Sequence, residues 1–313
     1  MGNSFCFSWE LKVIEFLQNH ITPVLQKLFE AITYLGDEYA IILILGFLYW
    51  GYKKDLGKKI GLSFVTSLMT TVVLGNIVMR RRPYFDHKEI KCLKPRSSKG
   101  DPYDISIQGF SFPSGHASNS ASTYAALGLS IGKKVLKVVL FLLPVLVGLS
   151  RVALGVHYPT DILAGWAVSA LVIFAISCIK NQYIIYLFVL LIGIVGCFVS
   201  KSADFFSSLG IAFGVLGGFI FEEKFVRFEN TKKVSAMILR TLGGLIIFIL
   251  VDKLLEVPFS NDFLSSTTGL SFMVRSIRYT IACFAVIGVY PLLFGFIDKK
   301  LRSRGGRLFG SSK

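Results

Sequence analysis

Charged residues are scarce in this sequence, since only 17% of the 313 residues are Asp, Glu, Lys or Arg. Soluble domains contain about 25%. Apolar residues make up 53%, and the mean hydropathy is +0.63. This composition excludes a disordered chain and an ordinary soluble enzyme. A transmembrane helix needs about 20 apolar residues, so the chain has room for eight or nine spans and little else. The sequence therefore predicts a polytopic membrane protein.

Acidic residues and cysteines are also few. The 34 Lys and Arg against 19 Asp and Glu give a net charge of +15. No RNA- or DNA-binding pattern accompanies this excess, so we expect no nucleic-acid partner and attribute it to loops facing anionic lipid and the cytoplasm. The five cysteines lack the spacing of a metal site, and three lie in apolar runs. We predict neither a disulfide framework nor a zinc site.

Uncharged stretches predict an all-α fold, a helical membrane bundle of about nine spans. The spans expected are Tyr39–Tyr52, Ile60–Met79, Ala117–Gly132, Val135–Leu149, Ile162–Ile179, Tyr183–Ser200, Phe205–Phe221, Val234–Val251 and Tyr279–Ile297. Charges interrupt the region before them, which predicts two amphipathic helices at the interface. We divide the chain into an interfacial segment (1–38), a catalytic core (39–180) and additional transmembrane helices with a basic tail (181–313).

The distribution of basic residues predicts the orientation of the bundle. The tail after Asp298 is basic, and short loops with lysines fall on its side, so we expect a cytoplasmic C-terminus in a multi-pass plasma membrane protein. Arg240 lies inside a predicted span. We interpret it as a snorkelling or helix-paired side chain, although an intramembrane arginine also suggests function.

Three polar clusters lie at span ends on the opposite, extracytoplasmic side: Arg80–Phe85, Phe112–Ser118 and Ser150–Asp161. In the second, Ser114 suits a helix N-cap and Gly115 lets an anion approach the backbone amides of the first turn. His116 follows in that turn. Pro-Ser-Gly is also common turn chemistry, and the arginines of the first cluster could be interfacial anchors.

The third cluster places His157 four residues before Asp161, with Pro159 suited to a helix start. This spacing predicts that a carboxylate fixes the imidazole tautomer and frees the other nitrogen as a nucleophile or base. Arg151 offers a bidentate fork for phosphate. Together the clusters supply what phosphoryl transfer requires. No carboxylate cluster is present to hold magnesium, so arginines would take the role of a metal; we expect no metal and no other cofactor.

These residues resemble the type 2 phosphatidic acid phosphatase superfamily, whose motifs run Lys-x6-Arg-Pro, Pro-Ser-Gly-His and Ser-Arg-x5-His-x3-Asp. The second and third are complete here. The resemblance implies that His157 attacks phosphorus and forms a phosphohistidine, that Asp161 orients it and that His116 protonates the leaving oxygen. It also implies a set of residues that bind the phosphoryl oxygens, namely Arg82, Ser114, the Gly115 amide, Ser150 and Arg151.

The first motif departs from the family pattern, because Gly75 stands where the family has Lys. Arg80 or Arg81 could replace this cation, although their helical phase differs. The function we predict is hydrolysis of the phosphomonoester or diphosphate of a lipid phosphate, with membrane lipid around it and a possible homo-oligomer. The alternatives are a sugar-phosphate phosphatase and a non-catalytic lipid-phosphate binder or transporter, which Gly75 favours. The basic loop Phe85–Phe110 could be a lid over the site or a solvated loop.

Overall fold

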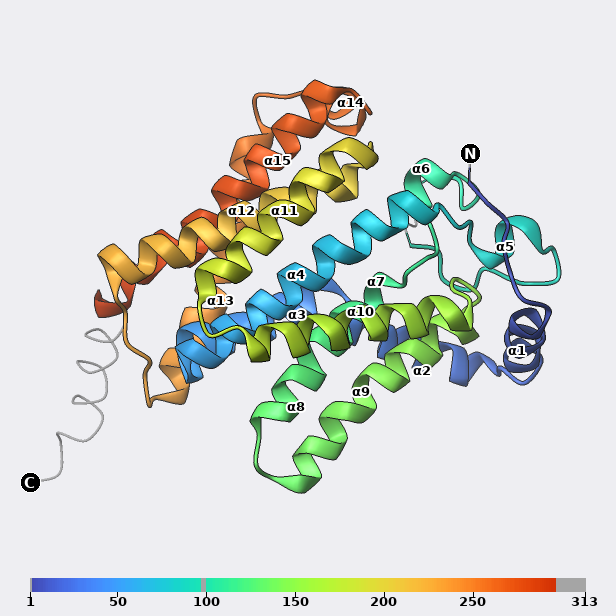
Figure 1. Ribbon diagram of the computed structural model, residues 1–313, viewed down its shortest axis with the longest axis horizontal. Helices are drawn as coiled ribbons and strands as arrows, with labels where there is room; N and C mark the ends of the chain where they lie inside the picture. The colour runs from blue at the N-terminus through green and yellow to red at the C-terminus, as the bar shows by residue number, and fades with distance from the viewer. Residues whose placement is uncertain (1, 97–99, 297–313) are drawn as a thin grey trace, which may run out of the picture. The chain divides into compact units, whose positions relative to one another are not determined.

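The computed structural model describes residues 2–96 and 100–296, which form helices joined by turns and loops (Figure 1). Within them no β-strand forms, apart from an isolated bridge between Asn3 and Arg80. The predicted all-α class is thus confirmed. The chain divides into two compact units, Met1–Ile41 with Ile60–Phe205, and Ile42–Lys59 with Phe206–Lys313.

The first unit carries all three polar clusters. Its helices are α1 (Ser8–Asn19), α2 (Pro23–Thr33), η1 (Tyr34–Gly36), the start of α3 (Glu38–Gly46), most of α4 (Lys54–Val78), α5 (Pro83–Asp86), α6 (Ile105–Gln108), α7 (Gly115–Ser120), η3 (Ala121–Ala125), α8 (Ala126–Ser130), α9 (Lys134–Ala153), α10 (Pro159–Cys178), α11 (Gln182–Val199) and the start of α12 (Ala203–Phe221). A buried apolar cluster from α1, α5, α7, the α9–α10 connection and α10 lies beside the polar residues described below.

The second unit completes α3, α4 and α12 and adds η2 (Phe47–Tyr52), η4 (Glu222–Val226), α13 (Val234–Glu256), α14 (Asn261–Ser265), α15 (Gly269–Phe284), η5 (Ala285–Val289) and η6 (Tyr290–Leu293). The Arg240 side chain is 2% exposed, and its Nη1 donates to the carbonyls of Trp50 at 2.9 Å and Glu229 at 2.8 Å. Arg240 is therefore a helix-paired side chain, one of the two interpretations that the sequence favoured.

In the described part of the chain, seven helices are long and apolar enough to cross a membrane, at Lys54–Val78, Lys134–Ala153, Pro159–Cys178, Gln182–Val199, Ala203–Val226, Val234–Glu256 and Gly269–Phe296. The pair Pro23–Gly36 and Glu38–Tyr52, bent by 49°, is an eighth candidate. The predicted span Ala117–Gly132 is helical only from Gly115 to Ser130, which is short for a crossing. About nine spans and a multi-pass membrane protein agree with this arrangement.

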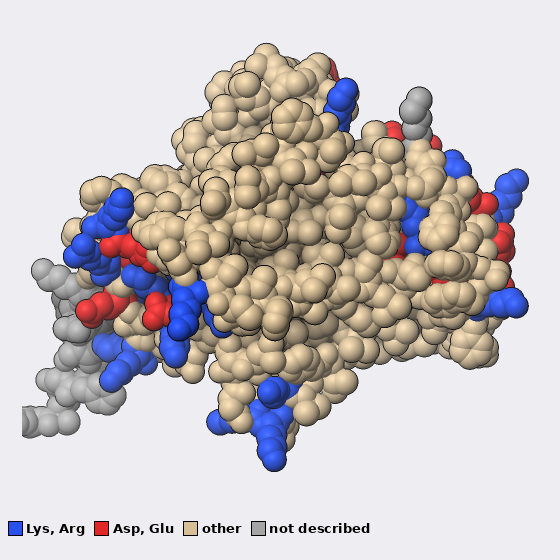
Figure 2. Space-filling model, viewed as in Figure 1, with Lys and Arg blue, Asp and Glu red and all other residues tan. Residues whose placement is uncertain are grey.

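The surface also distinguishes apolar helix faces from polar helix ends. On the face drawn in Figure 2, charged side chains gather at helix ends and connections and leave the helix surfaces between them uncharged. Many large apolar side chains of α9, α10 and α11 are exposed, Leu171 and Phe198 among them. Exposed apolar helix surfaces of this size are what lipid contact requires. The basic tail that indicated the orientation lies outside the described residues, so the orientation stays a prediction.

Candidate active site

The start of α7 forms the first part of the site. Ser114 is the N-cap of this helix, with an extended backbone and a side-chain oxygen that accepts from the Ala117 amide at 3.4 Å. The Ser114 amide donates to the carbonyl of Asp161 at 3.0 Å, which fixes the start of α7 against the start of α10. Gly165 of α10 allows this approach, because a Cβ there would lie 2.7 Å from the Ser114 carbonyl oxygen.

Open space lies in front of the first residue of α7. A Cβ built on Gly115 would meet no atom within 4 Å. The amides of a first helical turn, continued here through η3 and α8, favour an anion in such a space. His116 follows Gly115 and is partly exposed, and Arg151, His157 and Arg82 are near enough to act on its imidazole.

The connection between α9 and α10 forms the second part of the site. Gly155 has φ +74°, and a Cβ there would lie 2.2 Å from the Lys91 carbonyl oxygen, so the turn after α9 requires a glycine. The turn brings His157 back toward the last turn of α9, which carries Arg151. Both side chains are 3% exposed.

The tautomer of His157 follows from its hydrogen bonds. Its Nδ1 lies 2.8 Å from the carbonyl oxygen of Ser111, which can only accept. Nδ1 therefore carries the proton, and the unprotonated Nε2 accepts a hydrogen bond from Arg82 Nη1 at 3.4 Å. The Asp161 carboxylate lies further away, with its Oδ2 3.6 Å from Nδ1. A backbone carbonyl thus makes the contact for which the sequence indicated Asp161.

Asp161 acts on the histidine through its neighbours. Its Oδ2 accepts from the Ser111 hydroxyl and, at 2.8 Å, from the Tyr158 amide, so it both holds Ser111 and caps α10. His157 lies before the N-cap residue Tyr158 and outside the helix. This is why the four-residue spacing does not produce a direct helical contact.

Arg82 and Arg151 are buried cations without a carboxylate partner among residues 2–96 and 100–296. Arg82 donates to the carbonyls of Gln108, at 2.8 Å from Nη2, and Val156, at 3.0 Å from Nη1. Arg151 donates to the Thr33 hydroxyl at 3.0 Å, and its buried Nε has no partner in this part of the chain. Burial lowers the pKa of Arg82 to about 10, which still leaves it charged at neutral pH.

The positive charge of these arginines changes the acidity of both histidines. Burial, Arg82 and Arg151 lower the pKa of His157 well below 6.5. Burial, Arg151, His157 and Arg82 do the same for His116. The site thus holds two neutral imidazoles beside two guanidinium groups, and this excess of positive charge favours a bound anion.

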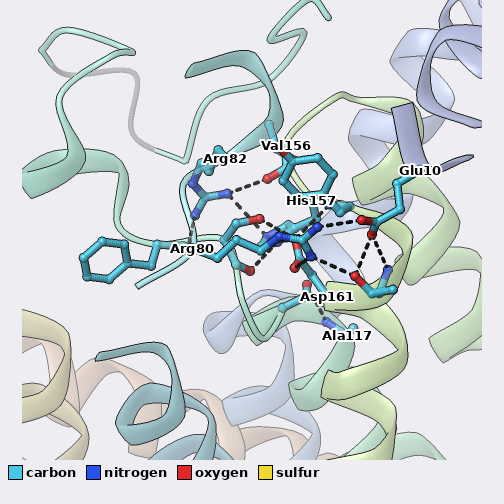
Figure 3. A network of polar contacts seen from close by, with 12 residues as sticks. Glu10, Arg80, Arg82, Ala117, Val156, His157 and Asp161 are labelled. Carbon is cyan, nitrogen blue, oxygen red and sulfur yellow. Dashed lines mark hydrogen bonds and ion pairs between the residues drawn. The ribbon is translucent and has the colours of Figure 1, made fainter. Parts of the chain in front are cut away.

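The other two arginines of the first cluster are ion-paired. Arg80 is 1% exposed and bonds Glu10 at 2.6 Å and Asp161 at 2.7 Å, so it is not an interfacial anchor (Figure 3). Arg81 is about one third exposed and pairs with Asp86 at 2.5 Å. Neither places an unneutralised cation where the family's lysine would stand. A Cβ on Gly75 would meet only the Phe112 carbonyl oxygen, at 3.1 Å.

Ser150 is the predicted phosphate ligand whose hydroxyl is engaged elsewhere. It is fully buried, and its Oγ donates to the Val147 carbonyl in its own helix at 2.7 Å. Arg96 of the loop Phe85–Phe110 is held by a bidentate pair with Asp204, at 2.5 Å and 2.7 Å. Among the described residues, no group of three or more His, Cys, Asp or Glu side chains gathers as metal ligands do.

Glu10 and Ser111 belong to the site but were not singled out from the sequence. Glu10 is one of two glutamates in the first helix, and its spacing from Ile14, also fully buried, is the only signal that it faces inward. Ser111 acts partly through its backbone carbonyl, which no side-chain pattern reports. Both residues reach the site through tertiary contacts.

Comparison with known proteins follows the same division of the chain. The model of the PAP2 superfamily matches residues 57–185, and that of the PAP2 superfamily phosphatase transmembrane extension matches residues 206–303. Phosphatidylglycerophosphatase B of Bacillus subtilis is 33% identical over 168 residues, 50% of this chain and 75% of that protein. Undecaprenyl-diphosphatase of Sulfolobus acidocaldarius is 33% identical over 121 residues, 37% of this chain and 53% of that protein.

Among solved structures, a transmembrane PAP2 type phosphatidylglycerolphosphate phosphatase from Bacillus subtilis aligns with a TM-score of 0.43 and 29% identity, covering 54% of this chain and 83% of that one. The family match over residues 57–185 contains all the motif residues of the site, and the match over 206–303 accounts for the later spans. With these matches and a relative aligned over three quarters of its length, the chain belongs to the PAP2 superfamily.

Proposed function

We propose that this protein is an integral membrane phosphatase that hydrolyses a lipid phosphate through a phosphohistidine, without a metal ion. The observation that carries the proposal is the His157 Nε2 atom, which is free of a proton and hydrogen-bonded to Arg82, a buried arginine without a carboxylate partner among the described residues. Arg82 and Arg151 supply the positive charge that a metal would otherwise bring to the phosphoryl oxygens. The names of the relatives, which are phosphatases of membrane lipids, support the substrate class.

In the first step, Nε2 of His157 attacks phosphorus, an N–P bond forms and the O–P bond to the lipid alcohol breaks. His116 gives its proton to the leaving oxygen. Its pKa is lowered by burial and by the neighbouring positive charge, and a bound phosphate dianion offsets that charge and raises the pKa. Substrate binding thereby favours the protonated form of His116, which can act as the acid.

In the second step, neutral His116 takes a proton from water, whose oxygen attacks phosphorus as the N–P bond breaks. Inorganic phosphate leaves, and His157 returns to its starting tautomer because the Ser111 carbonyl still holds the Nδ1 proton. The first-turn amides at Gly115 and the two arginines hold the equatorial oxygens in both steps.

The test is phosphate release by detergent-purified protein in excess EDTA. The substrates are phosphatidate, farnesyl diphosphate, sphingosine phosphate and glucose 6-phosphate. We expect release from at least one lipid, loss of at least about a thousandfold in His157→Ala, and wild-type activity in His20→Ala, a control at an exposed histidine. Labelled substrate should yield an acid-labile, base-stable phosphoprotein in the wild type and none in His157→Ala.

Two outcomes would redirect the proposal. Preference for glucose 6-phosphate, or its inhibition of lipid hydrolysis at millimolar concentration, would indicate a sugar-phosphate enzyme. Saturable binding of lipid phosphate with no release, also in Gly75→Lys, would indicate a binder or transporter. Gly75 favours that second candidate. Among the described residues, the two arginines that could replace the missing lysine, Arg80 and Arg81, are both ion-paired with carboxylates.

A further inference from the structure

The amino-terminal helix α1 is bound into the site through a buried carboxylate. Glu10 is 0% exposed and accepts four hydrogen bonds. Its Oε2 accepts from Arg80 Nη2 at 2.6 Å and from the Phe7 amide at 2.9 Å. Its Oε1 accepts from the amide of Thr160 at 3.1 Å and from the Thr160 hydroxyl at 2.5 Å. A carboxylate with every lone pair engaged away from water is a fixed part of its surroundings.

The groups that Glu10 holds lead directly to His157 (Figure 3). Thr160 lies in the first turn of α10, next to Asp161. Arg80 bridges the two carboxylates, since its Nη1 bonds Asp161 Oδ1 at 2.7 Å while Nη2 bonds Glu10. Asp161 in turn holds the Ser111 hydroxyl, and the Ser111 carbonyl holds Nδ1 of His157.

The remainder of α1 is docked as firmly as Glu10. Ile14, one turn later, is fully buried in the apolar cluster that contains Val156 and Tyr158. Gln18, on the same face, donates to the Lys91 carbonyl at 2.8 Å and accepts from the Lys91 amide at 3.0 Å. This face therefore belongs to the catalytic unit. The opposite face, with Trp9 and Phe16 exposed, is left for the predicted membrane interface.

Charge gives the arrangement a second effect. Glu10, Arg80 and Asp161 together carry a net charge of −1. This charge lies beside the His157 imidazole, whose other titratable neighbours are arginines and His116. The charged and titratable groups around His157 are Arg80 after α4, Arg82 before α5, Arg96 in the loop, His116 in α7, Arg151 in α9 and Asp161 in α10. Neutralising Glu10 would leave Arg80 to cancel Asp161, and this would make Nε2 less basic.

We infer that Glu10 is a positioning residue for the phosphoryl transfer, which fixes the start of α10 and preserves the negative charge beside His157. The inference rests on the proposed function for its kinetic consequences, but its geometry and charge do not depend on turnover. A purely structural glutamate would affect stability without moving the titration of His157.

The test uses the full-length protein in detergent with Glu10→Gln, Glu10→Asp and the control Glu15→Gln, which changes a partly exposed glutamate of the same helix. The four histidines are labelled with ¹⁵N, and His157→Ala identifies the His157 signals. We expect Glu10→Gln to lower the His157 titration by about half a pH unit or more, the effect of losing a charge beyond direct contact. Glu10→Asp keeps the charge, so His157 should titrate in this variant near its wild-type pH.

Kinetics on the preferred lipid phosphate add the geometric effect. We expect kcat to fall about tenfold or more in both Glu10 variants, because shortening and neutralising the side chain each disturb the network. KM should stay within about threefold of the wild-type value. The control Glu15→Gln should match the wild type in both constants. An unchanged His157 titration in folded Glu10→Gln would overturn the inference, whatever the activity. If Glu10→Gln does not fold, a Glu10→Asp variant with wild-type kcat would overturn it. If Glu10→Gln shifts the His157 titration but the wild-type protein releases no phosphate, the inference is retained and the proposed function is rejected.

Discussion

Three consecutive arginines have different surroundings, and the first two provide a sharp test of the structure through stability. Arg80→Ala removes a guanidinium that is 1% exposed and bonded to two fully buried carboxylates, Glu10 and Asp161. Arg81→Ala removes one that is about one third exposed and pairs with Asp86. The two substitutions are chemically identical and adjacent in the chain, so they differ only in what the fold places around them.

The expected magnitudes follow from burial. Removing one partner of a buried ion pair destabilises by about 3–5 kcal/mol, because a charge is left without compensation in a medium that solvates it poorly. Arg80→Ala leaves two such carboxylates, so we expect a loss at the upper end of that range. The Arg81–Asp86 pair is partly exposed, at 34% and 15% of the two side chains, so Arg81→Ala should lose much less, near the roughly 0–1 kcal/mol of a surface pair. The predicted difference is at least about 2 kcal/mol.

The assay is unfolding in a fixed detergent, followed by tryptophan fluorescence against denaturant concentration, with both variants measured beside wild type. A double variant, Arg80→Met with Glu10→Gln, should recover part of the loss, because one unpaired carboxylate is also removed. Equal stability of Arg80→Ala and Arg81→Ala, within about 0.5 kcal/mol, would refute the buried network and with it the assignment of Glu10 to the site.

Further predictions concern the phosphate pocket and its histidines. Gly75→Lys should fold, since a Cβ meets only the Phe112 carbonyl, and should strengthen orthovanadate inhibition about tenfold or more by adding a cation. Arg96→Ala removes a positive charge that lowers the pKa of His157, so the His157 titration should move upward in histidine NMR. The folded pKa values of His116 and His157 lie below 6.5, so the unfolded chain binds protons first as pH falls. The free energy of unfolding should then drop below pH 6.5 by up to about 1.4 kcal/mol per pH unit for each histidine, and His157→Gln should halve that slope in pH-dependent denaturation.

Local physics explains which parts of the site could be predicted. Ser114 caps α7 and Pro159 begins α10, as the sequence indicated. Capping depends on residues within one turn, so a pattern of residues is sufficient to find it. The motifs led to the superfamily that the comparisons confirm. The roles of His116, His157 and Asp161 remain predictions, which the experiments above test.

Predictions that depended on distant groups were less complete. The spacing of His157 and Asp161 suggested a direct bond, whereas Nδ1–H donates to the Ser111 carbonyl, because His157 precedes the helix that carries Asp161. The seven or eight candidate spans of the described residues agree roughly with the prediction of about nine. Residues 117–132 are apolar enough for a crossing, but their helix is cut short at Ser130.

The apolar helices and the capped starts of α7 and α10 depend on run length and nearest neighbours, so they and the residue types needed for phosphoryl transfer are legible in the amino-acid order. Which charges cancel depends instead on tertiary contacts. Arg80 and Arg82 are two residues apart, yet one is neutralised by Glu10 and Asp161 and the other is held by backbone carbonyls and faces the Nε2 of His157. A charge is neutralised by whatever lies within a few ångströms of it, and the two carboxylates that neutralise Arg80 come from helices 70 residues earlier and 81 residues later in the chain.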